Sequence, residues 1–122
     1  MPPITFNDWD LESNISDAIK GMGWEEPTQI QTESIPVARR GKDVVGQART
    51  GSGKTAAFGI PIIESCKPDG SLQSLVLCPT RELAVQVAEE MSNLQGKKSL
   101  KIGHLVLILG RTYGMWNYQM LI

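Results

Sequence analysis

The sequence predicts an α/β fold in which helices flank a parallel sheet. The chain has 122 residues, a length that supports one domain with its own core. Short apolar runs typical of buried strands alternate with stretches whose apolar residues recur at the helical period. Because the order is strand, helix, strand, helix, strand, the pattern favours parallel strands joined by covering helices.

Residues 1–41 are predicted to be helical. Apolar side chains from Asp8 to Met22 follow the helical period and indicate one amphipathic helix, which is ended by the glycines on either side of Met22. A second helix is expected to begin with Thr28 as its N-cap and to end before Gly41.

The strands are expected in the rest of the chain, each followed by a helix where the pattern allows. Asp43 to Gln47 is typical of a short buried strand, which leads through the glycine-rich segment Ala48 to Thr55 into a helix. Ser74 to Cys78 indicates a second strand, and the apolar residues from Leu83 to Leu94 form the clearest helical stripe in the chain. A third apolar run, Ile102 to Leu109, is compatible with a strand.

The segment between the first strand and its helix has the composition of a phosphate-binding loop. Gly51 and Gly53 let the backbone turn tightly and present N–H groups to phosphate oxygens. Lys54 can reach the β- and γ-phosphates, and the Thr55 hydroxyl is suited to hold Mg²⁺. The general pattern has glycine where this chain has Ala48. The alternative is a glycine-rich turn that begins a helix and binds no ligand.

Three segments together resemble the DEAD-box ATP-dependent RNA helicases. Gly23 to Gln31 resembles their Q motif, and Phe6 stands 17 residues before Gly23, where the family has an isolated aromatic residue. Ala48 to Thr55 is similar to the family's own form of the Walker A motif, in which alanine takes the first position. Pro79 to Ala84 matches motif Ia.

By this resemblance the chain is an incomplete RecA-like P-loop domain, with a parallel sheet and flanking helices. Residues 1–41 are then the Q-motif region, residues 42–104 part of the helicase ATP-binding domain, and residues 105–122 a divergent, truncated tail. The family implies ATP and Mg²⁺ as cofactors, and RNA and an adenine nucleotide as partners.

The resemblance also implies roles for single residues. Gln31 reads the adenine edge, Phe6 stacks on the base, and Trp24 packs nearby. Lys54 and Thr55 are the catalytic residues, and Thr55 holds Mg²⁺. The ATP-binding residues are Phe6, Trp24, Thr28, Gln31, Ala48, Arg49, Thr50, Gly51, Ser52, Gly53, Lys54 and Thr55. The RNA-binding residues are Pro79, Thr80 and Arg81.

Two of these roles have a local alternative. The spacing of Thr28 and Gln31 is also that of a capping box, in which Gln31 closes the start of a helix. Thr80 can likewise merely cap the helix after the second strand, with Arg81 in solvent. The local pattern alone favours the cap in both cases, whereas the family resemblance favours the ligand.

The function expected from these motifs is the ATP- and RNA-binding part of an RNA helicase. All 13 Asp and Glu residues stand at or before Glu90, so no acidic Walker B residue follows, and we expect no ATP hydrolysis by this chain alone. The alternatives are a catalytically dead nucleotide- and RNA-binding fragment and a non-functional fragment with unpaired sheet edges.

Composition argues against several other classes. With Cys66, Cys78 and His104 as its only cysteines and histidine, the chain lacks the ligands of a structural zinc site, and reduced thiols are expected. No apolar run approaches ~20 residues and the N-terminus does not resemble a signal peptide, so a cytoplasmic protein without membrane contact is expected. The net charge of −1 gives no overall indication of nucleic acid.

Overall fold

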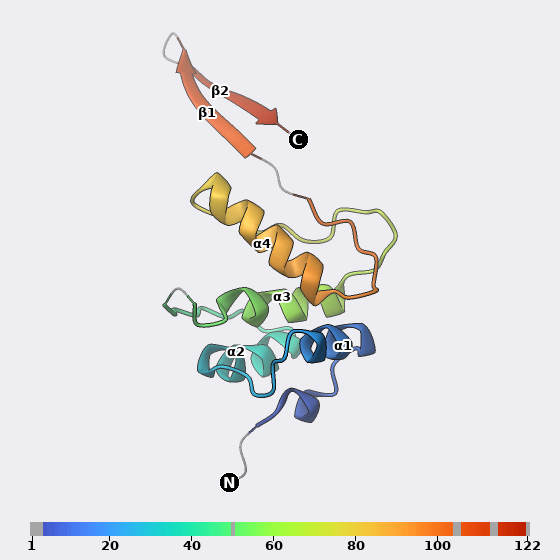
Figure 1. The fold of residues 1–122 in the computed structure, drawn as a ribbon. Helices are drawn as coiled ribbons and strands as arrows, with labels where there is room; N and C mark the ends of the chain where they lie inside the picture. The colour runs from blue at the N-terminus through green and yellow to red at the C-terminus, as the bar shows by residue number, and fades with distance from the viewer. Residues whose placement is uncertain (1–3, 50, 104–105, 113–114, 122) are drawn as a thin grey trace.

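The computed structural model describes residues 4–49, 51–103, 106–112 and 115–121 (Figure 1). Its helical part begins with a 3₁₀ helix, continues through α-helices, and is followed by a β-hairpin. The elements are η1 (Phe6–Trp9), α1 (Ser13–Gly21), α2 (Gln29–Arg39), α3 (Lys54–Ser65), α4 (Arg81–Leu94), β1 (Val106–Thr112) and β2 (Met115–Leu121). None of the helices in these ranges is long and apolar enough to cross a membrane.

Side-chain caps define where two of the helices begin. The Thr28 N–H donates to Gln31 Oε1 at 3.0 Å before the first turn of α2. The Thr80 hydroxyl oxygen accepts from the Leu83 N–H at 3.2 Å before α4. Such bonds satisfy backbone groups that have no acceptor within the helix. Both predicted N-caps therefore occupy the positions that the sequence indicates.

The first predicted helix, from position 8 to 22, is two elements in the structure. η1 ends at Trp9 and α1 begins at Ser13. Between them Asp10 adopts a left-handed backbone, with φ 49° and ψ 54°, which a right-handed helix cannot accommodate. Aspartate visits this region more readily than most side chains do, because its short polar group can bond locally.

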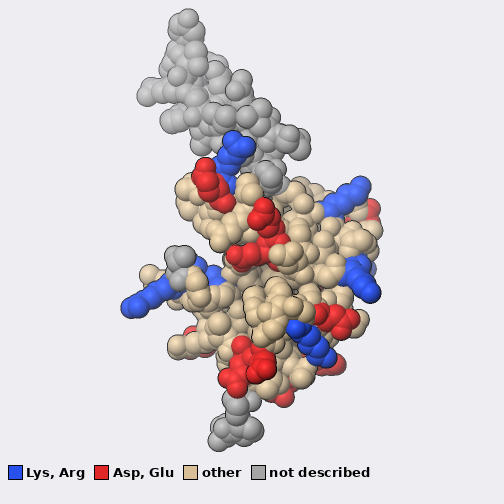
Figure 2. All heavy atoms as spheres, viewed as in Figure 1, with Lys and Arg blue, Asp and Glu red and all other residues tan. Residues whose placement is uncertain are grey.

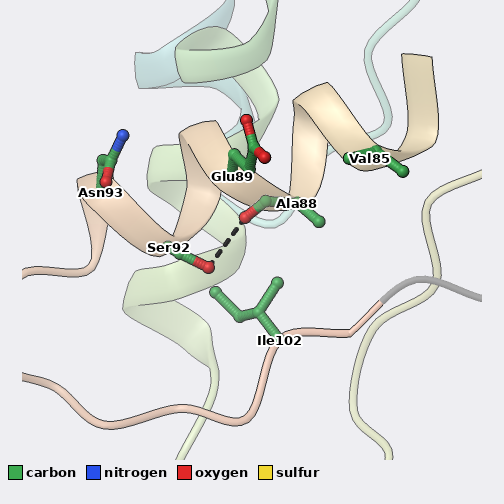
Figure 3. A pocket seen from close by; sticks show the side chains of 6 residues that line it. All are labelled: Val85, Ala88, Glu89, Ser92, Asn93 and Ile102. Carbon is green, nitrogen blue, oxygen red and sulfur yellow. Dashed lines mark hydrogen bonds between the residues drawn. The ribbon is translucent and has the colours of Figure 1, made fainter. Parts of the chain in front are cut away.

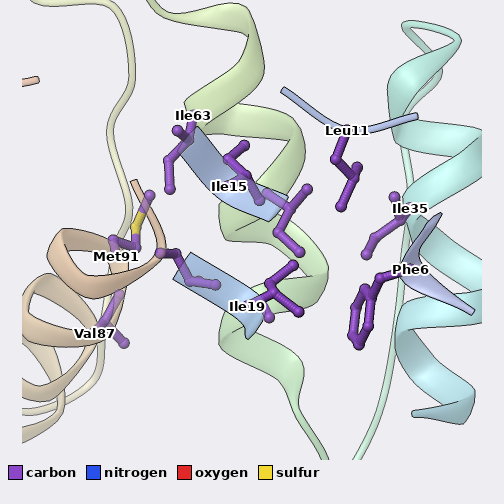
Figure 4. Packing of buried hydrophobic residues seen from close by; sticks show 11 residues of the cluster. Phe6, Leu11, Ile15, Ile19, Ile35, Ile63, Val87 and Met91 are labelled. Atoms are coloured by element: carbon purple, nitrogen blue, oxygen red, sulfur yellow. The ribbon is translucent and has the colours of Figure 1, made fainter. Parts of the chain in front are cut away.

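The core lies where the helices meet (Figure 4). Ile15 and Ile19 of α1, Ile35 of α2, and Ile60 and Ile63 of α3 are almost wholly buried. Burying one such side chain contributes about 1.5–3 kcal/mol. The whole cluster is Phe6, Leu11, Ile15, Ile19, Ile35, Ala56, Ile60, Ile63, Val87, Met91 and Leu94.

The parallel sheet that the sequence predicts is not confirmed. Residues 43–47 and 74–78 run without strand pairing, and Val45, Leu75 and Leu77 are 103%, 73% and 85% exposed. Strands of a parallel sheet need hydrogen-bonded neighbours and are covered on both faces. Neither segment has a paired neighbour in the described part of the chain, so its local apolar pattern does not make it a strand.

The sheet that the described residues do form is an antiparallel hairpin. β1 pairs with β2 from Val106 opposite Leu121 to Thr112 opposite Met115. The third apolar run, at 102–109, overlaps β1, but its partner is the next segment of the chain and not a parallel strand. Two positions of that run, 104 and 105, lie outside the described ranges.

Candidate functional site

The predicted phosphate loop leads directly into α3. Gly51 and Gly53 both have positive φ angles, 80° and 84°, which the backbone needs to turn into the helix and which glycine adopts without strain. Lys54 is the first residue of α3, and the Ala57 N–H donates to the Gly53 carbonyl at 3.2 Å. The unbonded backbone N–H groups in the first turn of α3 therefore lie beside this loop, where the partial positive charge of the helix favours an anion.

A second turn stabilises the loop on its N-terminal side. The Ser52 N–H donates to the Arg49 carbonyl at 3.2 Å, and the Ser52 hydroxyl donates to the same oxygen. Arg49 and Lys54 are exposed, whereas Thr55 is half-buried in the first turn of α3. Thr50 lies outside the described residues. The loop is thus shaped by its own hydrogen bonds, with two cationic side chains at the surface.

Gln31 connects α2 to this loop. Its side chain is buried, with 2% exposed. The amide oxygen accepts from the Thr28 N–H at 3.0 Å, and the amide nitrogen donates to the Gly53 carbonyl at 3.1 Å. The capping alternative for Gln31 is therefore present in the structure, and so is a contact with the phosphate loop that the spacing did not reveal. One N–H of the amide remains for another acceptor.

The two aromatic residues of the predicted adenine site stack on each other. The ring centroids of Phe6 and Trp24 are 6.3 Å apart and the ring planes meet at 28°. Phe6 is buried, and Trp24 is 39% exposed. A cavity of about 280 Å³ opens beside this pair, lined by Thr5, Phe6, Asn7, Ser16, Ile19, Lys20, Trp24 and Glu25. Gln31 does not line it, so the predicted adenine residues form two groups.

The predicted RNA contact lies at the start of α4. Pro79, Thr80 and Arg81 are exposed. The Thr80 hydroxyl caps the helix through Leu83, as the local alternative predicts. A capped helix still has backbone N–H groups in its first turn that can meet an anion, so the cap and a phosphate contact are compatible.

The surface charge is mixed. On the face seen in Figure 2, Lys and Arg side chains stand beside Asp and Glu side chains, without a broad patch of one sign. Among the described residues no group of three His, Cys, Asp or Glu side chains is arranged to hold a metal ion. On this face a bound phosphate would therefore meet local backbone N–H groups and single cations.

A second cavity, of about 420 Å³, lies on the outer side of α4 (Figure 3). Its lining is Val85, Ala88, Glu89, Ser92, Asn93 and Ile102. The Ser92 hydroxyl donates to the Ala88 carbonyl of its own helix at 2.8 Å. None of these residues was predicted as functional, and the sequence carries no motif there. Its polar groups do not converge, so it does not resemble a site.

Comparison with known proteins identifies similar sequences and folds. The family model described as DEAD/DEAH box helicase matches residues 28–114. The DEAD-box ATP-dependent RNA helicase CshA of Bacillus licheniformis is 50% identical over 100 residues, which are 81% of this chain and 20% of that protein. The probable ATP-dependent RNA helicase MJ0669 of Methanocaldococcus jannaschii is 47% identical, over 84% of this chain and 28% of that protein.

Solved structures agree with these sequence matches. A DEAD box protein from the hyperthermophile Methanococcus jannaschii superposes with a TM-score of 0.73 at 47% identity, over 77% of this chain and 26% of that one. A hypothetical ATP-dependent RNA helicase from Sulfolobus tokodaii gives 0.62 at 44% identity, over 69% and 24%. The chain spans about a fifth to a quarter of the length of the relatives it matches.

Proposed function

The chain belongs to the DEAD/DEAH box helicase family, and from that premise we propose that it forms the ATP- and RNA-binding part of an ATP-dependent RNA helicase. The observation that supports this best is the glycine-rich turn at Gly51 and Gly53 leading into the N-terminus of α3. On this proposal residues 1–41 are the Q-motif region, 42–104 are part of the RecA-like domain, and 105–122 are a divergent tail.

The phosphates of ATP are the ligand proposed for this loop. Backbone N–H groups from Gly51 to Lys54 would surround the phosphate oxygens, and the Lys54 ammonium would lie against the β- and γ-phosphates. Thr55 would hold Mg²⁺, whose preference for oxygen ligands, waters and substrate phosphates fits a single protein hydroxyl at this position. The metal, when bound, neutralises charge on the phosphates.

The adenine is proposed to bind near Phe6, Trp24 and Gln31. The Phe6 ring is already stacked against Trp24. A base would therefore enter the cavity beside the pair. Gln31 retains one amide N–H beyond its bonds to Thr28 and Gly53. Gln31 does not line that cavity, so it would gain a bond to the adenine only if the base extended beyond the cavity toward the start of α3.

RNA is proposed to meet the start of α4. Exposed Pro79, Thr80 and Arg81 would contact phosphates through backbone N–H groups and the guanidinium. Contacts of this kind orient a nucleic acid without reading its base sequence.

The second candidate function is nucleotide and RNA binding without hydrolysis. The observation that favours it is the sequence after Glu90, which contains no Asp or Glu. A carboxylate normally helps to hold the metal and to organise the attacking water in P-loop enzymes. We therefore expect this chain to bind nucleotide and to show no steady-state ATPase activity, with or without RNA.

Titration with a fluorescent adenine nucleotide in the presence of Mg²⁺ tests the proposal. Lys54→Ala should weaken binding by about tenfold or more, equivalent to at least ~1.4 kcal/mol. Lys67→Ala, which removes an exposed lysine from the loop after α3, is the matched control and should bind as the unaltered chain does. Absence of binding by a folded chain, or equal binding by both variants, would contradict the proposal.

A further inference from the structure

Lys98, in the turn after α4, joins the ends of two other helices. Its ammonium group donates to Glu12 Oε1 at 2.8 Å and to the backbone carbonyls of Ile63 and Glu64. Glu12 is the N-cap of α1, and the two carbonyls belong to the last turn of α3. The Lys98 side chain is only 11% exposed. A cation at this point also offsets the partial negative charge at the end of α3.

The same turn is fastened to α1 by uncharged groups. The Asn14 side-chain amide donates to the Gln95 carbonyl at 2.9 Å. The Gln95 side chain brackets Leu100, accepting from its N–H at 2.7 Å and donating to its carbonyl at 3.2 Å. A Cβ atom on Gly96, whose φ is 58°, would lie 2.5 Å from the Asn14 carbonyl oxygen. The backbone here is therefore held closely against α1.

The opposite ends of α3 and α4 carry the two proposed ligand contacts. Both helices run in the same direction in Figure 1 and come closest toward their C-terminal ends. The C-terminal part of α4 packs on the middle of α3, with Met91 and Leu94 at 3.5 Å from where a Cβ of Gly59 would be. Arg81, at the start of α4, is exposed. The phosphate loop and the RNA contact thus stand at the open end of the helix pair.

A small change in the angle between α3 and α4, made near their C-terminal ends, would displace their N-terminal ends by a larger distance. α3 has 12 residues and α4 has 14, so each is roughly 18–21 Å long. A tilt of about 10° between them displaces a helix start by roughly 3 Å. That displacement is comparable to the length of a hydrogen bond, so it decides whether both helix starts can hold their ligands together.

We propose that Lys98 is a positioning residue that sets the separation between the start of α3 and the start of α4. It touches neither ligand and acts through the two helices. The significance of that separation depends on the proposed function, in which one start holds nucleotide phosphates and the other holds RNA. The Lys98 ammonium bonds two carbonyls and a carboxylate, and these bonds depend on direction. They therefore favour one arrangement of the helix ends more strongly than apolar packing alone does.

The separation can be measured in the whole 122-residue chain. Spin labels at Lys54 and Glu82, attached through unnatural amino acids so that the two cysteines are left intact, give the distance by pulsed electron paramagnetic resonance. Lys98→Met should broaden the distribution and shift its mean by roughly 3 Å. The matched control Lys97→Met, on the exposed neighbour, should leave it unchanged, and Lys98→Arg should restore most of it.

An unchanged distribution in a folded Lys98→Met chain overturns the proposal. Should that variant fail to fold, Glu12→Gln replaces it, because it removes the charge that Lys98 bonds and leaves the Asn14 and Gln95 contacts in place. Broadening supports the proposal and an unchanged distribution again overturns it. None of these distance measurements requires a ligand, so they decide the role of Lys98 even if the proposed function is wrong.

Ligand titrations of the unlabelled chain test the consequence. In the unaltered chain a non-hydrolysable ATP analogue should change the affinity for a short oligouridine by about fivefold or more. Lys98→Met should retain each separate affinity and lose this coupling. Retained coupling would refute the positioning role. If the unaltered chain binds neither ligand, the proposed function fails, and a distance distribution that responds to Lys98→Met still supports the geometric role.

Discussion

The Gly53 carbonyl accepts the Gln31 amide at 3.1 Å, and the residue has a φ of 84°. A Cβ atom at this position would lie 2.4 Å from Gln31 Nε2 and 3.0 Å from Thr28 Oγ1. Gly51 has nearly the same backbone, with a φ of 80°, but a Cβ there meets nothing within 4 Å. Substituting alanine at the two positions therefore distinguishes two effects within one loop: both changes strain the backbone, and only the change at Gly53 adds steric overlap.

Gly53→Ala should lower the free energy of unfolding more than Gly51→Ala does. The left-handed backbone costs each alanine about 1–2 kcal/mol. Only Gly53→Ala also displaces the buried Gln31 amide, and a buried hydrogen-bonding group left unpaired costs about 1–3 kcal/mol. Urea unfolding of both variants measures the difference. Equal losses would mean that Gln31 moves aside without cost.

Gln31 shows which residue contacts a sequence can predict. Its bond to Thr28 follows from a three-residue spacing, and the structure contains it. Its bond to Gly53 joins positions 22 apart, and nothing local indicates that partner. The same holds for Lys98, whose acceptors belong to Glu12 and α3. Roles of Gln31 and Lys54 toward a nucleotide remain predictions from the family resemblance.

At the scale of elements, the helices were predictable and the parallel strands were not. The helices from α2 to α4 follow from apolar periodicity and caps, which depend on neighbours within a turn or two. A strand depends on partners elsewhere in the chain. Residues 43–47 and 74–78 have the right composition but no paired neighbour among the described residues, and Val45 and Leu77 stay exposed.

Two other glycines test how tightly the helices pack. A Cβ on Gly59, in the middle of α3, would be 3.5 Å from Leu94 and Met91, an ordinary contact distance. Gly59→Ala should therefore raise the free energy of unfolding by about 0.5–1 kcal/mol, because alanine favours a helix. Gly96→Ala should lower it, since its Cβ would meet the Asn14 carbonyl at 2.5 Å. Thermal unfolding of each variant checks both signs, and a destabilised Gly59→Ala would contradict the packing.

At the scale of the whole molecule, exposed apolar side chains on the unpaired segments predict self-association. Val45 and Leu77 are 103% and 85% exposed, and such side chains beside unpaired backbone favour contact with another chain. The double variant Val45→Lys and Leu77→Lys should reduce association in sedimentation velocity without lowering the free energy of unfolding. The double variant Gln47→Lys and Ser74→Lys, which adds the same two charges at exposed polar positions, should reduce it less. A monomeric unaltered chain would refute this prediction.

Glu64 is the residue at which charges from several elements meet. Its Oε1 atom lies 3.0 Å from Arg39 Nε of α2, and Lys98 and Glu12 face it from the turn after α4 and the N-cap of α1. Burial raises the pKa of Glu64 above its ordinary value of 4.5, although Arg39, the Glu12 backbone and Lys98 lower it; the Glu12 carboxylate makes a smaller contribution that raises it. The cost of removing the carboxylate from water therefore exceeds the attraction of its cations.

Stability should consequently fall as the pH rises above 4.5. The folded chain binds the Glu64 proton more tightly than the unfolded chain does, so the contribution of Glu64 is fully present below 4.5 and is lost as the pH rises through the raised pKa. Glu64→Gln should make the free energy of unfolding depend less on pH above 4.5. Urea unfolding between pH 4 and 7 measures this dependence. Arg39→Met should steepen the pH dependence of the free energy of unfolding, because the cation nearest to Glu64 is removed. A Glu64→Gln chain with the slope of the unaltered protein would show that the carboxylate ionises freely in the fold.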